Sequence, residues 1–403
     1  MSLKLKAKPY LLKNKIQNYE WGARSESAYI PQLLKLEIKE DVPYAELWIG
    51  SHAKAPSKIE IDDEQIALDR LIENGCITGI DPLVKLPYLL KVLSAGEALS
   101  IQSHPNKQQA VHLNKLDPVN YSDNNHKPEI AIALDTLTAL AGFRPAIEIK
   151  SIFEQYAIFG ELLGVEVSNF IESIGCENEI VTFRMFYEKL LKQSILEPAL
   201  FLLKLNELEN EIKCKKSHDD KETLFLELKK KYKNADVGLL SIFLFNHVTL
   251  SAGQALFIDA GVPHAYLRGN IIECMANSDN VVRAGLTPKF VDVDNLIEIL
   301  VYDLKRPEIL NREDGLIISE YKVPVSDFKI SSLKLNKGEQ LDIEVDDKPI
   351  VILLLSGEIK FSFGSEEWLH SQGDTLLLPA ELSSINISSL ENDALAFMVQ
   401  IPT

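Results

Sequence analysis

Short apolar runs separated by proline and glycine dominate the first 145 residues, as in the stretch 86–93. This texture predicts an all-β body with loops and a few helices. From residue 146 to 237 the pattern changes, and Leu205, Leu208 and Ile212 recur at helical spacing. Such spacing aligns apolar side chains on one face of a helix. We therefore expect a helical insert domain at 146–237, with its charge runs on solvated faces.

Alternating apolar and polar positions return in the stretch 251–258. We expect residues 1–145 and 238–312 to form one discontinuous domain, and residues 313–403 to form a C-terminal β domain. Closely spaced glycine and proline in the last segment are typical of a jelly roll. The predicted fold is mainly β, with cupin-type jelly-roll barrels and an α-helical domain inserted in the first. Expected C-terminal strands cover 330–335, 343–345, 350–355, 359–363, 374–378 and 394–400.

Composition adds limits on the kind of partner. The 403 residues are 46% hydrophobic and 25% charged, average for a soluble protein of two or three domains. The longest apolar run, 350–355, is too short to span a bilayer. A net charge of −17 argues against nucleic acid or an anionic membrane as the partner. Any anionic substrate would need lysines and arginines gathered locally.

The four cysteines, Cys76, Cys176, Cys214 and Cys274, have neither metal-finger nor redox spacing. Scattered cysteines of this kind are typical of reduced thiols in a cytoplasmic protein. We take a monomer as the default state of the chain.

A first candidate site is the stretch 100–107. If it is extended, Ser100, Gln102 and His104 point to one face, because side chains two apart in a strand share a face. Polar groups on an inward face need partners. A metal is one such partner, and a hydrogen-bonded core pair is another.

A second candidate is the stretch 124–134. Pro128 disfavours a helix across His126 and Glu129, so these two are not ligands on one helical turn. In an extended chain Glu129 shares a face with Ala131 and Ala133, whose small side chains leave space for a bound group. The simpler alternative is a loop leading into an ordinary strand.

The third candidate combines His264, which follows an apolar strand in Gly-x-Pro-His, with Glu273 and the polar loop 278–289. Cupin barrels commonly bring a ligand histidine to the mouth in such a context. A turn-rich polar loop of this kind suits the edge of an open site.

These stretches, together with 44–52 and 86–93, resemble those of type I phosphomannose isomerases. The resemblance covers most of 15–145 and 245–295, and it is weak in the helical insert and the C-terminal unit. It implies that one zinc ion is bound by Gln102, His104, Glu129 and His264. Neighbouring departures from the family pattern are Ser103, Asn106, Asn124 and Asn277, none of which removes a ligand.

The resemblance also implies a function: interconversion of mannose 6-phosphate and fructose 6-phosphate through a metal-stabilised enediolate, supplying GDP-mannose biosynthesis. The proton acceptor is either Glu273 or Lys127, and Arg283 would stabilise the enediolate. Expected substrate-binding and pocket residues are Lys91, Ser100 and Lys289 for the phosphate, with Trp21, His126, Tyr266 and Asp279 in the pocket; His126 could assist ring opening.

Two other functions use the same residues. A cupin oxygenase would hold iron on two histidines and one glutamate, but Gln102 as a fourth ligand argues against it. A non-catalytic sugar-phosphate sensor would need neither Lys127 nor Glu273 as a base.

Overall fold

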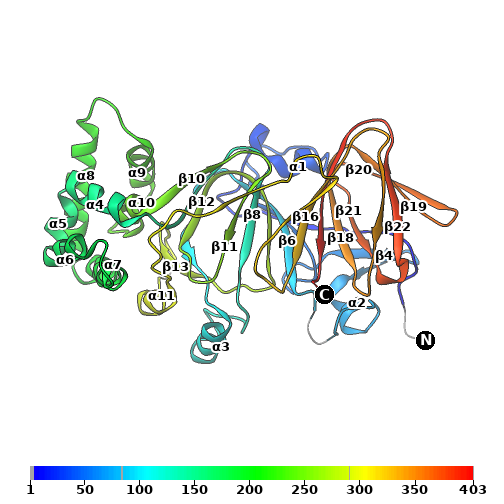
Figure 1. Ribbon diagram of the computed structural model, residues 1–403, viewed down its shortest axis with the longest axis horizontal. Helices are drawn as coiled ribbons and strands as arrows, with labels where there is room; N and C mark the ends of the chain where they lie inside the picture. Colours follow the sequence, from blue (N-terminus) through cyan, green and yellow to red (C-terminus); the bar gives the residue numbers. More distant parts are fainter. Residues whose placement is uncertain (1–3, 83–84, 290, 403) are drawn as a thin grey trace.

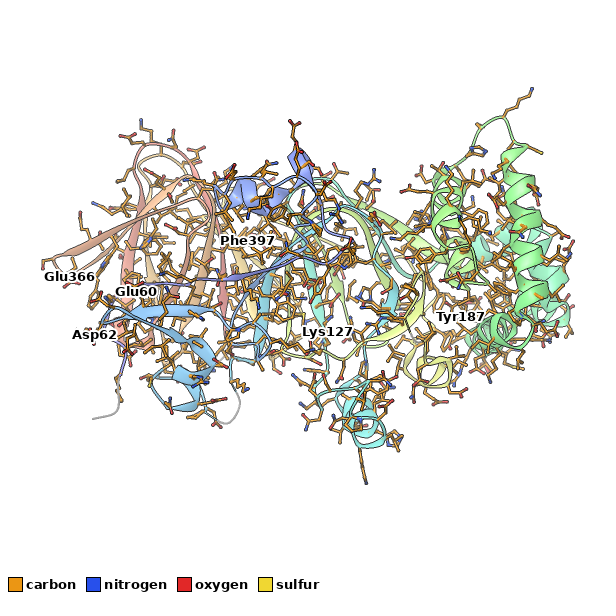
Figure 2. The ribbon with its side chains drawn as sticks, turned by 180° about the vertical axis from the view of Figure 1, so that it is seen from behind. Glu60, Asp62, Lys127, Tyr187, Glu366 and Phe397 are labelled. Carbon is orange, nitrogen blue, oxygen red and sulfur yellow. The ribbon has the colours of Figure 1, made fainter. Side chains whose placement is uncertain are left out.

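The computed structural model describes residues 4–82, 85–289 and 291–402. Helices gather at one end of the molecule, a large sheet occupies the middle, and the C-terminal strands lie at the other end, near both chain termini (Figure 1). Figure 2 shows Tyr187 among the helices, Lys127 in the middle and Phe397 among the C-terminal strands. The predicted class, mainly β with helices, is confirmed at this level. In the described ranges, no helix combines the length and apolarity that crossing a membrane requires.

The central sheet has eleven strands, with a main path β14-β11-β8-β12-β6-β3-β2 and the others paired at its side. Its members are β2 (Lys15–Gln17), β3 (Glu46–Ile49), β6 (Tyr88–Ala95), β7 (Ile101–Ser103), β8 (Glu129–Ala133), β9 (Leu137–Phe143), β10 (Phe245–Leu250), β11 (Gln254–Ile258), β12 (His264–Ala276), β13 (Val282–Gly285) and β14 (Ile309–Asn311).

Strand β12 connects the two parts of this sheet. Its first half pairs with β7 and β9, and its second half pairs with β6 and β8. The change occurs at Gly269, where φ is +125° and a Cβ would lie 2.6 Å from the Thr136 carbonyl oxygen. Only glycine tolerates that close approach. The bend brings strands from both parts of the sheet around one interior.

Side chains alternate across β6, β8 and β12. Val92, Ile132 and Cys274 face outward into a buried apolar cluster, together with residues of the C-terminal strands. Because alternate residues point to opposite faces, Lys91 and Glu273 face the interior of the sheet. The inner face of the sheet therefore carries polar residues together with a second apolar cluster, whereas the outer face packs against the C-terminal strands.

The C-terminal strands form a six-stranded sheet and a four-stranded sheet with an apolar cluster between them. The first comprises β1 (Tyr10–Leu11), β15 (Ile318–Tyr321), β16 (Lys329–Leu335), β18 (Ile350–Ser356), β21 (Thr375–Leu378) and β23 (Ala394–Gln400). The second comprises β17 (Gln340–Glu344), β19 (Glu358–Phe363), β20 (Glu366–Ser371) and β22 (Ser384–Ser389).

All six C-terminal strands expected from the sequence are present, although their ends differ by a few residues. Strands β15, β20 and β22 were not predicted, because polar residues interrupt their apolar positions. Nor was it predicted that Tyr10 and Leu11 pair with Leu377 and Leu376. The N-terminal strand thus joins the C-terminal sheet.

The helices of the stretch 146–244 pack around aromatic side chains such as Phe183, Phe186 and Tyr187. In α9 a capping box joins Asp219 and Glu222 at the first turn, and lysines occupy the last turn. This charge order complements the helix dipole. The helices are α4 (Ala146–Gln155), α5 (Ile158–Leu163), α6 (Val165–Ser173), α7 (Glu179–Leu196), α8 (Pro198–Lys213), α9 (Asp220–Lys231) and α10 (Gly238–Leu244).

The remaining elements cover the sheets and loops. They are α1 (Tyr29–Leu33), α2 (Leu68–Glu73), α3 (Lys107–Leu116), α11 (Val293–Ile299), the 3₁₀ turns Ser25–Ser27 and Ala380–Leu382, and the two-stranded sheet of β4 (Lys58–Ile61) and β5 (Glu64–Ala67).

Candidate active site

Three of the predicted ligands meet at one buried point. His104 follows β7, Glu129 begins β8 and His264 begins β12. Glu129 Oε1 lies 3.0 Å from His264 Nε2, and Glu129 Oε2 lies 3.4 Å from His104 Nε2. All three side chains are fully buried, and their donor atoms lie within 4.8 Å of one another. Two imidazoles and a carboxylate so close together form a set that suits zinc.

Hydrogen bonds orient both imidazoles toward this point. His104 Nδ1 lies 2.8 Å from the Asn280 carbonyl oxygen, and His264 Nδ1 lies 3.0 Å from that of Val262. An Nδ1–H that donates to a carbonyl leaves the Nε2 lone pair free for a metal. Burial, together with the nearby Lys127 ammonium, lowers the pKa of His104 to about 4. The imidazole is therefore neutral near pH 7, as a metal ligand must be.

One oxygen at this point lacks a hydrogen-bond partner. Glu129 Oε2 is buried and accepts no hydrogen bond from the described residues. A buried carboxylate oxygen left unbonded is costly unless something else neutralises it. The Lys127 ammonium is 3.2 Å away, and Tyr266 donates a hydrogen bond of 3.0 Å to the other oxygen. The donor set thus fits a bound cation.

Gln102, the fourth predicted ligand, lies beside the group. Its side-chain nitrogen is 3.3 Å from His264 Nε2, and its backbone pairs with that of His264. The two ends of a side-chain amide are exchanged by a half-turn, which would turn the oxygen toward this position. Ile101 packs in the apolar core, whereas Gln102, the next residue of the strand, lines the cavity.

The helix after His104 is held by one of the departures from the family pattern. Asn106 caps α3 by accepting a hydrogen bond of 2.9 Å from the Gln109 backbone nitrogen. The Gln109 side-chain oxygen accepts a hydrogen bond from the Asn106 backbone N–H, so the capping box is complete. Asparagine caps as well as aspartate does. The departure therefore still provides a complete cap for the helix that follows His104.

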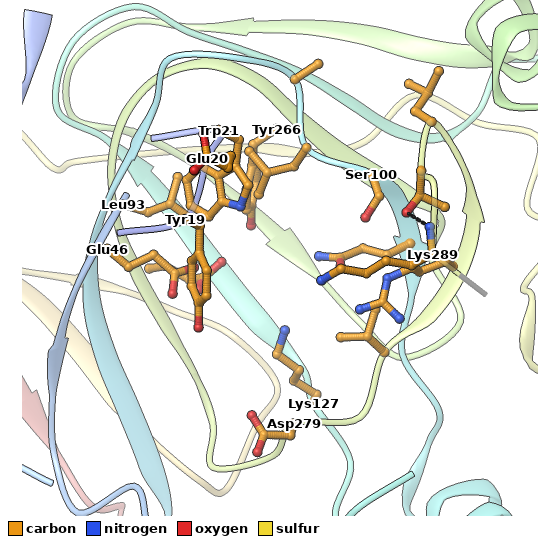
Figure 3. Close-up of a pocket in the computed structure, with 18 of the residues that line it drawn as sticks. Tyr19, Glu20, Trp21, Glu46, Leu93, Ser100, Lys127, Tyr266, Asp279 and Lys289 are labelled. Carbon is orange, nitrogen blue, oxygen red and sulfur yellow. Dashed lines mark hydrogen bonds between the residues drawn. The ribbon is translucent and has the colours of Figure 1, made fainter. Parts of the chain in front are cut away.

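A cavity of about 810 Å³ opens beside the buried group. Figure 3 shows Ser100 and Lys289 on one side of it and Tyr19 and Glu46 on the other, with the Lys127 side chain directed into the space between. A cavity of this size with convergent polar groups suits a small polar ligand. The predicted residues that line it are Trp21, Lys91, Ser100, Gln102, Lys127, Tyr266, Glu273, Asp279, Arg283 and Lys289.

Lys91 is engaged differently from the prediction that it binds phosphate. Its ammonium lies 2.8 Å from Glu273 Oε2, 3.7 Å from Glu46 Oε1, and over the Trp48 ring. Although burial disfavours the charged form, these two carboxylates raise the pKa of Lys91. Burial raises the pKa of Glu273, and the charge of Glu129 adds to this. Lys91 is thus a buried partner of two carboxylates rather than a free phosphate ligand.

Arg283 remains uncompensated. It lies on β13 directly opposite Gln102, its side chain is half-buried, and its desolvation lowers its pKa. Among the described residues it forms no ion pair. Asp279, an acidic residue of the same cavity, lies 2.8 Å from Lys54 Nζ and 3.4 Å from His52 Nε2 instead. A half-buried guanidinium without a carboxylate is a site for an anion.

His126 lies away from the cavity lining, contrary to the expectation for the pocket. Its Nε2 is 2.9 Å from Asp327 Oδ2, because the extended chain at Pro128 turns it to the face opposite Glu129. We assign His126 no part in ring opening.

Several lining residues were not found from the sequence. Glu46 lies within the stretch 44–52, and Lys54 lies just after it. Because this stretch resembles the corresponding part of the family, both residues could have been found from it. Lys231 and Tyr232 come from the end of α9, and Lys231 lies 2.6 Å from Glu97 at the rim. Nothing in the helical periodicity of the insert indicated that its last turn reaches the cavity.

Comparison with known proteins decides the family. The family model described as "Phosphomannose isomerase type I, catalytic domain" matches residues 10–146. Mannose-6-phosphate isomerase 2 of Arabidopsis thaliana is 36% identical over 391 residues, covering 91% of this chain and 88% of that protein. The mannose-6-phosphate isomerase of Mus musculus is 36% identical over 370 residues, covering 85% of this chain and 86% of its own length. The chain belongs to the type I phosphomannose isomerase family.

Solved structures of phosphomannose isomerases share the fold. A crystal structure of a variant enzyme from Salmonella typhimurium has a TM-score of 0.83 at 27% identity, covering 98% of this chain and all of that one. A zinc-bound mannose 6-phosphate isomerase has a TM-score of 0.81 at 27% identity, with the same coverage. The resemblance inferred from the sequence is confirmed. The His104–Glu129–His264 group and the zinc-bound relative together support zinc as the cofactor.

Proposed function

We infer that the chain is a zinc-dependent isomerase that interconverts mannose 6-phosphate and fructose 6-phosphate. The observation that carries this is a buried His–Glu–His group at a cavity lined by both carboxylates and cations, in a chain of the phosphomannose isomerase family. An oxygenase or a sensor is disfavoured by the family and by the basic and acidic groups gathered in the cavity.

His104, Glu129 and His264 would hold the zinc ion, with Gln102 as the fourth ligand. One carboxylate and three neutral groups leave it a formal charge near +1. When bound, zinc supplies a Lewis acid for negative charge that develops on the sugar oxygens. A thiolate-rich structural site would cancel that charge.

Glu273 is the better candidate for the base that takes the C2 proton of the open-chain aldose and returns it to C1. Its carboxylate lines the cavity, and burial brings its pKa toward working pH. The Lys127 side chain is directed into the cavity and lies 3.2 Å from the Glu129 carboxylate. It would relay the proton that passes between the O1 and O2 oxygens of the sugar.

Arg283 would hold negative charge on the enediolate oxygens, since it lies opposite Gln102 and has no carboxylate partner among the described residues. Ser100 and Lys289, on the same side of the cavity, would bind the phosphate (Figure 3). Trp21 and Tyr266 would form walls of the sugar pocket.

The proposed domains are a cupin-type catalytic barrel of 1–145 and 238–312, a helical insert of 146–237 and a jelly-roll unit of 313–403. The bend of β12 supports the first, and the apolar cluster between two sheets supports the last. The enzyme acts as a monomer in a reducing, cytoplasmic compartment, which suits four free thiols and a site built from one chain.

Replacing Arg283 by alanine should lower kcat for mannose 6-phosphate by about a hundredfold, because one preorganised donor to the developing oxyanion is lost. Zinc bound per chain should stay unchanged, since Arg283 is not a ligand. A coupled assay of fructose 6-phosphate formation and metal analysis of the same sample check this. Unchanged turnover would remove Arg283 from the reaction.

A further inference from the structure

Asp236 is a buried carboxylate outside the catalytic group. It lies in the connection between α9 and α10, and the whole residue is 6% exposed. Among the described residues no cation forms an ion pair with it. A buried carboxylate of this kind is costly unless hydrogen bonds satisfy it. The groups around the carboxylate must therefore provide hydrogen bonds that offset this cost.

Three backbone N–H groups donate to this carboxylate. Gly238 and Leu286 donate to Oδ1 at 2.8 and 2.9 Å, and Thr287 donates to Oδ2 at 3.2 Å. Two of the donors, Leu286 and Thr287, lie 50 and 51 residues further along the chain, directly after β13. Asp236 thus ties the end of the helical insert to the turn that follows the Arg283 strand.

The held turn has an unusual backbone. Leu286 has a φ of +52°, in the left-handed region that residues other than glycine rarely adopt. The turn also packs against the insert so closely that a Cβ on Gly238 would lie 2.6 Å from the Leu286 nitrogen. Such a conformation persists only where surrounding contacts impose it. Hydrogen bonds from both Leu286 and Thr287 to one carboxylate supply such contacts.

The same turn carries cavity residues. Leu286, Thr287 and Lys289 all line the cavity. The Lys289 backbone nitrogen donates a hydrogen bond of 3.1 Å to Thr287 Oγ1, which is drawn as a dashed line in Figure 3. A continuous series of hydrogen bonds therefore runs from Asp236 through the Thr287 backbone and hydroxyl to the Lys289 backbone. Moving the turn would move the Lys289 side chain.

We propose that Asp236 is a positioning residue for the substrate phosphate: it fixes the Leu286–Thr287 turn so that Lys289 faces the cavity beside Ser100. This rests on the proposed assignment of Lys289 to the phosphate. Asp236, which does not itself line the cavity, then influences the affinity for the sugar phosphate from the end of the helical insert.

The test compares Asp236→Asn, Lys289→Ala and the double variant, with KM and kcat for mannose 6-phosphate, zinc content and thermal midpoint measured on each. Asp236→Asn should raise KM by about tenfold with kcat little changed, because the amide cannot accept from all three donors. Zinc content should be unchanged. In the double variant, KM should rise no further than in the more affected single variant, since both act through one group.

Asp219→Asn is the matched control. Asp219 also accepts a backbone N–H, from Glu222 at the start of α9, but it forms no hydrogen bond with the Leu286–Thr287 turn. Its variant should keep the wild-type KM. If Asp236→Asn does not fold, Thr287→Val breaks the later bond to the Lys289 nitrogen and should raise KM in the same direction.

The outcomes separate the two assignments. If Lys289→Ala leaves KM unchanged, the phosphate assignment fails, and the positioning role falls with it. If Lys289→Ala raises KM but Asp236→Asn and Thr287→Val do not, the phosphate assignment stands and the role of Asp236 is overturned. Effects that multiply in the double variant also overturn it, because Asp236 would then act independently of Lys289.

Discussion

Glu273→Gln is expected to lower kcat for mannose 6-phosphate by about a thousandfold, because the variant lacks the carboxylate that accepts the C2 proton. Glutamine keeps the size of the side chain. It also leaves Lys91 with a second carboxylate, Glu46, whose oxygen lies 3.7 Å away, so the buried ammonium is not left unpaired. Turnover by a coupled assay, with zinc content and thermal midpoint, measures the effect.

Glu46→Gln is the matched control for this variant. Glu46 is another buried carboxylate beside the same lysine, and it accepts a hydrogen bond of 2.6 Å from Trp48 Nε1 that an amide oxygen can also accept. Its substitution should cost far less turnover than that of Glu273. Equal losses in the two variants would mean that the pair with Lys91, rather than proton transfer, accounts for the effect.

The pH profile gives an independent measure of the base. Burial raises the pKa of Glu273, so the carboxylate is present above that pKa and is lost as the pH falls through it. The acid limb of kcat/KM should therefore lie above the usual range for a glutamate, and it should be absent from the residual activity of Glu273→Gln. Measuring the zinc content at each pH distinguishes protonation of Glu273 from protonation of the metal ligands. An unchanged acid limb in the variant would exclude Glu273 as the group that titrates there.

Local patterns indicated single fragments of the metal site, whereas the family resemblance implied the ligand set. The alternation that places Gln102 and His104 on one face, and the proline that forces an extended chain before Glu129, act over a few residues. The sequence therefore indicates each fragment of the site. Local patterns do not show how the fragments come together. In the structure the β12 strand brings them together, and from the sequence only the family resemblance indicated that they form one site.

Long-range pairing was not predictable in the same way. Lys91 was assigned to the phosphate as one of the cations that an anionic substrate would need, whereas its partner Glu273 lies opposite it on β12, 182 residues away. Likewise, nothing near Asp236 indicates that its carboxylate binds a turn 50 residues further on. Strand register and loop packing decide such contacts, and both depend on the whole fold.

Removing the metal is expected to have the other large effect. Chelation should lower isomerase activity by at least about a thousandfold, since Lewis-acid stabilisation contributes several kcal/mol to the transition state. Added zinc should restore activity, whereas magnesium should not, because imidazole ligands favour zinc. The thermal midpoint should also fall, since Glu129 Oε2 would be left buried and without a hydrogen bond.

Two histidine variants connect this loss to the proposed ligands. His264→Gln should reduce bound zinc and activity together, because it removes a donor from the buried group. His247→Gln is the control: His247 is half-buried on β10, and its Nε2 lies 3.0 Å from the Ile242 carbonyl oxygen, outside the group. This variant should retain zinc and turnover. Full activity in protein shown by metal analysis to be free of zinc and other divalent ions would exclude the metal from the reaction. Loss of zinc from both variants would instead mean that the fold, and not the ligand set, had been disturbed.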